Sequence, residues 1–86
     1  MRVRIPSPLH SYTGNQSMVD AAGATVDLVT HDHDRQFPGI RFRIIDEQDQ
    51  VRPHVKLFVN GEQVFGLVRA LAPADELAIV QAFSGG

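Results

Sequence analysis

The residues with the clearest chemical potential lie at the end of the chain, where the sequence reads Ser84-Gly85-Gly86. They follow an apolar run, residues 77–80, that is typical of a strand. Glycine weakens a strand and packs nothing, so a Gly-Gly end adds little to stability. It does let a backbone enter a space where any Cβ would clash, with the Gly86 carboxylate leading. Taken alone, the stretch also fits a frayed tail or glycines added by cloning, so the rest of the chain has to decide.

Composition predicts a small soluble domain with one core. The chain has 86 residues, of which 43% are hydrophobic and 21% are charged, as in ordinary globular proteins. Its net charge of −2 and its scattered arginines argue against a nucleic-acid partner, because such proteins usually carry a basic stripe. Cysteine is absent, which excludes disulfides, thiolate metal sites and a cysteine nucleophile, and fits the reducing cytoplasm. No apolar run approaches the ~18 residues that a membrane span requires, so we expect a cytoplasmic protein that does not enter a membrane.

Periodicity predicts five strands and one main helix, in the order β-β-α-(connector)-β-β-β. The strands are expected at residues 2–5, 18–22, 55–60, 63–65 and 77–80. The helix begins after Thr25, a good N-cap, and ends before Pro38. Its inner face is marked by Val26, Val29, Thr30, His33 and Phe37. Residues 40–45 fit either an alternating strand or a short helical turn, and we favour the turn.

This order of elements indicates an α+β domain in which the helix covers one face of a mixed sheet. A hairpin, a crossing helix and then further strands is the arrangement of a β-grasp, or ubiquitin-like, fold. We therefore expect a mixed sheet of four to five strands packed on one main helix, in a single domain of residues 1–86. Residues 81–86 are expected to form a flexible C-terminal tail.

Five segments together resemble the MoaD/ThiS family of ubiquitin-like sulfur carriers. They are I-P-S-P-L-H-S-Y-T-G near the start, F-P-G after the helix, the V-N-G-E-Q-V hairpin, L-A-P-A-D-E-L-A-I-V and the terminal S-G-G. They occur in the family's order over nearly the whole chain. The sequence departs from the family at His10, Asn15 and His33, where arginine, glycine and a leucine-like residue are more usual. The opening segment is most similar to carriers of the molybdopterin-synthase small-subunit type and the cysteine-synthesis type.

The resemblance implies a carrier and not an enzyme, with Gly86 as its reactive residue. An E1-like adenylating enzyme would activate the Gly86 carboxylate with ATP. A sulfur donor, such as a rhodanese or a cysteine desulfurase, would convert the adenylate into a thiocarboxylate, and a sulfur-accepting synthase would then take the sulfur. Gly85 has no side chain that would obstruct the enzyme channel or the incoming sulfur. The chain itself would bind no cofactor, because it has no glycine-rich phosphate loop and the partner would hold the ATP.

Three residues near the end of the chain are expected to contact the partner enzyme. By the resemblance, Val80 matches a position that touches the activating enzyme, although a place in the core is an equally open alternative. Phe83 lies beyond the strand, so contact with a partner is favoured over a place in the core. Ser84 belongs to the same tail and is grouped with it.

Two other functions remain open. One is a ubiquitin-like modifier that is joined through the same Gly-Gly tail to lysines of target proteins. The other is an interaction or metal-binding module with an accidental Gly-Gly end. His31 and His33 are of a type that binds metals, but residues two apart on a helix face different ways. We therefore favour a solvated turn with His33 partly buried and expect no metal site. The pathway that receives the sulfur is left open among molybdopterin, cysteine, thiamine and thiolated metabolites.

Overall fold

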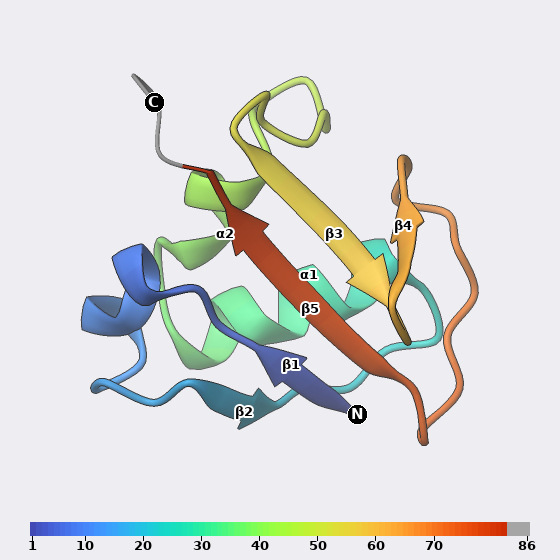
Figure 1. Cartoon of the computed structure of the whole chain (residues 1–86), viewed down its shortest axis with the longest axis horizontal. Coiled ribbons are helices and arrows are strands. Elements are labelled where there is room, and N and C mark those ends of the chain that lie inside the picture. The colour runs from blue at the N-terminus through green and yellow to red at the C-terminus, as the bar shows by residue number, and fades with distance from the viewer. Residues whose placement is uncertain (83–86) are drawn as a thin grey trace.

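A computed structural model describes residues 1–82 of the chain (Figure 1). Its elements are β1 (Arg2–Arg4), the 3-10 helix η1 (Ser7–Tyr12), β2 (Met18–Asp20), α1 (Val26–Gln36), α2 (Ile40–Ile44), β3 (Val55–Val59), β4 (Glu62–Val64) and β5 (Glu76–Gln81). The predicted order of elements is confirmed, and α2 is the helical turn that we favoured over a strand. β4 ends at Val64. The expectation that Phe65 belongs to this strand is wrong, because the chain has already left the sheet there.

β5 lies at the centre of a mixed five-stranded sheet with the order β2-β1-β5-β3-β4. It runs parallel to β1, with Val3 opposite Leu77, and antiparallel to β3, with Leu57 opposite Ile79. α1 crosses behind the sheet in Figure 1, and the other face of the sheet is turned toward the viewer. The last strand is thus hydrogen-bonded on both sides, which fixes the position of its end at Gln81.

The core lies between the sheet and its helices. Alternate residues of the three central strands turn toward it, among them Val3, Leu57, Val59, Leu77 and Ile79, each at most 3% exposed. The opposing side chains are those of Val26, Val29, Ile40 and Ile44, all at 0%. The predicted inner face of the helix is confirmed, because its four positions within α1 are buried and Phe37 packs against the core.

α1 has a sequence of poor helix propensity, so its ends and its neighbours must hold it. Thr25 is its N-cap as predicted, and the Thr25 hydroxyl accepts a hydrogen bond from the Leu28 N–H at 3.2 Å. The Asp32 carboxylate accepts another from the Ala22 N–H at 2.9 Å. This second bond ties the middle of the helix to the segment that follows β2.

Gly23, just before α1, marks a close approach of two backbone segments. A Cβ at Gly23 would lie 2.5 Å from the Val29 backbone nitrogen and 2.8 Å from the Leu28 carbonyl carbon. We expect Gly23→Ala to lower the free energy of unfolding by about 1–3 kcal/mol, because backbone must move to admit the methyl group. Urea unfolding measures the change. Gly66→Ala is the matched control, since a Cβ there meets nothing within 4 Å, and equal losses at both sites would contradict this explanation.

His33 places a titratable ring in the core. It is 1% exposed, and its Nε2 has no hydrogen-bond partner among residues 1–82. Burial lowers the pKa of His33 below its ordinary value of 6.5, while the charges of Asp34 and Asp32 act in the opposite direction but more weakly. The folded state therefore keeps the ring neutral at a pH where the unfolded state already binds a proton.

Stability should consequently be fully present above pH 6.5 and should fall as the pH drops through the folded-state pKa, by up to about 1.4 kcal/mol per pH unit. Urea unfolding between about pH 8 and about pH 5 measures this slope. We expect His33→Leu to flatten it, because leucine fills the site without a titrating group. If His33→Leu kept the wild-type slope, the titrating group would lie elsewhere.

Candidate functional site

The end of β5 determines where the tail leaves the domain. Gln81 pairs with Val55 of β3, and the Ala82 N–H donates a hydrogen bond to the His54 carbonyl oxygen at 2.8 Å. The chain is therefore held to β3 through Ala82, two residues into the segment that we expected to be tail. The remaining predicted site residues lie outside the described residues, and they are Phe83, Ser84, Gly85 and Gly86.

Val80 lies on the face of the sheet that points away from α1. The alternation along β5 buries Leu77 and Ile79, at 1% and 3% exposure, and leaves Val80 45% exposed. The alternative that placed Val80 in the core is therefore wrong. Contact between Val80 and a partner enzyme remains a prediction, now with a side chain that a partner can reach.

Phe58 is a residue of this face that the sequence analysis did not single out. It pairs with Ala78 of β5, next to the pair formed by Lys56 and Val80, and it is half-buried. Paired residues of neighbouring strands project to the same side of a sheet, so Phe58, Ala78 and Val80 form one apolar strip. The signal was present in β3, because burying Val55, Leu57 and Val59 forces Phe58 outward.

A shallow hollow of about 220 Å³ adjoins this strip between β5 and the segment that follows β1. Its walls are residues 4–8 and 79–81, including the side chain of Val80. The strip and the hollow lie at the end of β5 from which the tail leaves. A partner that receives the tail would meet both of them next to its entrance.

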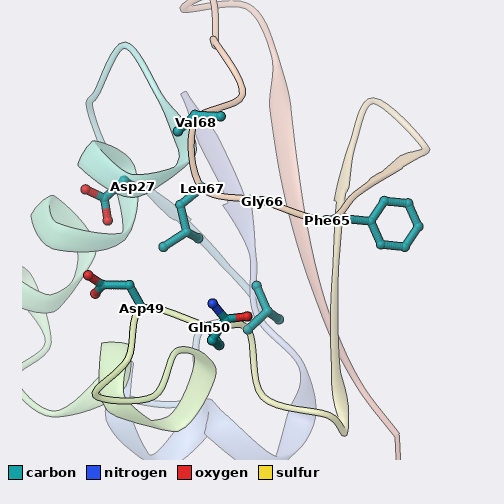
Figure 2. Close-up of a pocket in the computed structure, with 8 residues that line it drawn as sticks. Asp27, Asp49, Gln50, Phe65, Gly66, Leu67 and Val68 are labelled. Atoms are coloured by element: carbon teal, nitrogen blue, oxygen red, sulfur yellow. The ribbon is translucent and has the colours of Figure 1, made fainter.

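Another hollow, of about 420 Å³, lies elsewhere, between the start of α1, residues 49–51 and residues 65–68. Leu67 points into it, whereas Phe65 points away from it (Figure 2). Its two carboxylates, those of Asp27 and Asp49, both accept hydrogen bonds from Arg41. No residue of β5 lines it, so we do not place the carrier site there.

Neither a metal-ligand cluster nor a membrane-spanning helix occurs among residues 1–82. Among residues 1–82, no three His, Asp or Glu side chains are grouped so that they could hold a metal ion. The expectation of a solvated turn with His33 partly buried is wrong, because both histidines lie within α1 and His33 is only 1% exposed, whereas His31 is exposed. No helix within residues 1–82 has both the length and the apolar composition that a membrane span requires.

The architecture defines a class of protein, the β-grasp or ubiquitin-like domains, and the predicted fold is confirmed. A chain in the crystal structure of the Amycolatopsis orientalis BexX/CysO complex superposes with a TM-score of 0.91 at 33% identity, over 99% of this chain and 98% of that one. Small archaeal modifier protein 1 of Haloferax volcanii superposes with a TM-score of 0.79 at 28% identity, over 100% and 98% of the two chains.

The chain belongs to the ThiS family, whose model matches residues 3–86. The sulfur carrier protein CysO of Mycobacterium tuberculosis is 36% identical to it over 89 residues, which cover 98% of this chain and 96% of CysO. The predicted membership of the MoaD/ThiS sulfur carriers is thereby confirmed. The chain is thus a homologue of a sulfur carrier protein.

Proposed function

We propose that this protein carries sulfur as a thiocarboxylate on Gly86. The observation that carries the proposal is the extent of the family match, which includes Gly85 and Gly86 at the very end of residues 3–86. The geometry of β5 supports it, because the strand is fixed through Ala82 and the exposed Val80 stands beside the exit. The four residues after Ala82 would reach roughly 13–14 Å if extended, enough to bring the carboxylate into a partner while the domain stays outside.

The proposed reaction uses the chain end as an acyl group. The Gly86 carboxylate attacks the α-phosphorus of ATP on an E1-like enzyme, which releases pyrophosphate and leaves an acyl adenylate. A sulfide sulfur then adds to the carbonyl carbon, AMP departs, and a thiocarboxylate remains. A rhodanese or a cysteine desulfurase would instead offer the sulfur as an enzyme persulfide. Its outer sulfur would displace AMP to give an acyl disulfide, and a second thiol would then release the thiocarboxylate while forming a disulfide with the enzyme sulfur. ATP would be held by the adenylating enzyme. We expect the process in the cytoplasm, where ATP is supplied.

The recipient of the sulfur is proposed from the relatives. Those at 33–36% identity are CysO proteins, which favours a carrier of the cysteine-synthesis type over the molybdopterin type. The relative from Amycolatopsis orientalis was crystallised as a BexX/CysO complex, which supports a partner protein for this chain as well. The similarity to small archaeal modifier protein 1 is lower, at 28% identity. We therefore favour the carrier over a modifier.

Intact-protein mass spectrometry tests the proposal. The full chain is incubated with an E1-like adenylating enzyme, ATP and sulfide. The expected result is a mass increase equal to the replacement of one oxygen by sulfur, which disappears when ATP is left out. Lysine-linked conjugates without this change would instead favour the modifier. A chain that stays unchanged with every E1-like enzyme offered would refute both.

A further inference from the structure

Basic side chains surround the point where the tail leaves the sheet. Arg43 of α2 and His54, the residue before β3, both line a hollow of about 350 Å³ that is also lined by Gln81. The same two residues, with Arg52, line a second hollow of about 190 Å³. His54 is also the residue whose carbonyl holds Ala82. We call Arg43, Arg52 and His54 the tail-exit rim.

Both arginines of the rim are held in place by neutral groups. Arg43 Nε donates to the Tyr12 hydroxyl at 2.8 Å, and its guanidinium lies 5.9 Å from the centre of the Tyr12 ring. Arg52 Nε donates to the Phe42 carbonyl oxygen at 2.6 Å, and its guanidinium lies 4.5 Å from the centre of the Phe42 ring. A guanidinium has five N–H donors, so each arginine keeps its terminal nitrogens for another acceptor. Because the arginine side chains are already positioned, they lose little conformational entropy when an acceptor binds.

The charges of the rim are not balanced by carboxylates of the described chain. Within residues 1–82, the arginines that form ion pairs are Arg4, Arg35, Arg41 and Arg69. Arg43 and Arg52 are not among them, and neither rim hollow is lined by an Asp or Glu. The protein as a whole carries a net charge of −2. A positive region at the tail exit of an acidic protein points to an acidic surface as its counterpart.

We infer that the tail-exit rim docks against Asp and Glu side chains at the channel mouth of the adenylating enzyme. This inference rests on the proposed function, in which the tail enters that channel and Gly86 reacts inside it. Whatever surrounds the tail where it leaves the sheet must then lie against the edge of the channel. Arginine presents paired donors that match a carboxylate, and charges at the edge of an interface mainly raise the association rate.

The double substitution Arg43→Gln/Arg52→Gln tests the inference. Thiocarboxylate formation is measured against carrier concentration, at low and at high salt, with an E1-like enzyme and sulfide that modify the wild-type chain. We expect the KM for the carrier to rise roughly 5–10-fold at low salt with kcat nearly unchanged, since two exposed ion pairs are lost. The wild-type KM should rise with salt, whereas that of the double variant should depend on it much less.

Two control variants separate docking from folding and from net charge. Arg43→Lys/Arg52→Lys keeps the charges and should keep most of the affinity and of the salt dependence. Arg2→Gln removes one charge from β1, at a position opposite Glu76 in the sheet and therefore beside the other end of β5. This variant should leave the KM for the carrier unchanged. Urea unfolding shows whether each variant is folded. If the double glutamine variant is not folded, the single variant Arg52→Gln is tested in its place.

Three results would overturn the inference. The first is a KM for the folded double glutamine variant that stays within about twofold of the wild-type KM. The second is a rise in the KM of Arg2→Gln as large as that of the double variant. The third is a wild-type KM that does not change with salt concentration. A wild-type chain that no E1-like enzyme modifies would refute the proposed function itself. Because that result concerns the wild type alone, it is distinguishable from a failure of the rim.

Discussion

Deletion of Gly86 is expected to abolish thiocarboxylate formation. The new terminal carboxylate, on Gly85, would lie one residue short, by roughly 3.3–3.6 Å in an extended chain. Since a displacement of about 1 Å at a reacting centre costs about 100-fold in rate, we expect the loss to exceed about 100-fold. Adenylation is measured by ATP–pyrophosphate exchange and sulfur transfer by intact mass.

The deletion should leave the fold intact, because the hydrogen bonds described for the end of β5 finish at Ala82. Its urea unfolding curve is therefore expected to match that of the wild type. Gly86→Ala is an informative companion, since it keeps the length of the tail and adds a single methyl group beside the carboxylate. If Gly86→Ala lost less of the rate of thiocarboxylate formation than the deletion, the length of the tail would matter more than the absence of a side chain at its end. Unchanged thiocarboxylation after the deletion would show that the reaction does not occur at Gly86.

Local signals account for the parts of the fold that are predictable from sequence. Asn60-Gly61 predicts a tight hairpin turn, and these residues have φ values of 50° and 84° between β3 and β4. Asn15, between η1 and β2, has a φ of 67°. Asparagine adopts this left-handed region more readily than most residues. In both turns, the residue type and the backbone conformation are linked within a few residues, so no tertiary information is required.

Two features depend on tertiary structure and were not predictable. They are the choice of which β5 side chains face the core and the assembly of the tail-exit rim. Alternation shows that Ile79 and Val80 face opposite ways, but the pairing of β5 with β1 and β3 decides which one is buried. Arg43 comes from α2, whereas Arg52 and His54 come from the segment between α2 and β3, and the three share no spacing motif. They become one feature only because the fold brings Arg43 and Arg52 beside His54, whose carbonyl holds Ala82.

The two neighbours Ile79 and Val80 should separate stability from docking. Ile79 is 3% exposed in the core, and Ile79→Ala should lower the free energy of unfolding by about 2–5 kcal/mol. That is a large share of the about 5–15 kcal/mol that stabilises a typical domain. Val80 is 45% exposed, so Val80→Ala should cost less than about 1 kcal/mol. Urea unfolding of both variants measures the contrast.

Val80→Ala should instead act on the partner, because it removes apolar surface from the strip beside Phe58 and Ala78. We expect a higher KM for the carrier in thiocarboxylate formation and an intact fold. For Ile79→Ala, the reaction should fall only in proportion to the unfolded fraction, and should recover at a temperature where that variant is folded. If Val80→Ala lost as much stability as Ile79→Ala, the strip would be part of the core. If it left KM unchanged, the strip would not be the surface on which the adenylating enzyme docks.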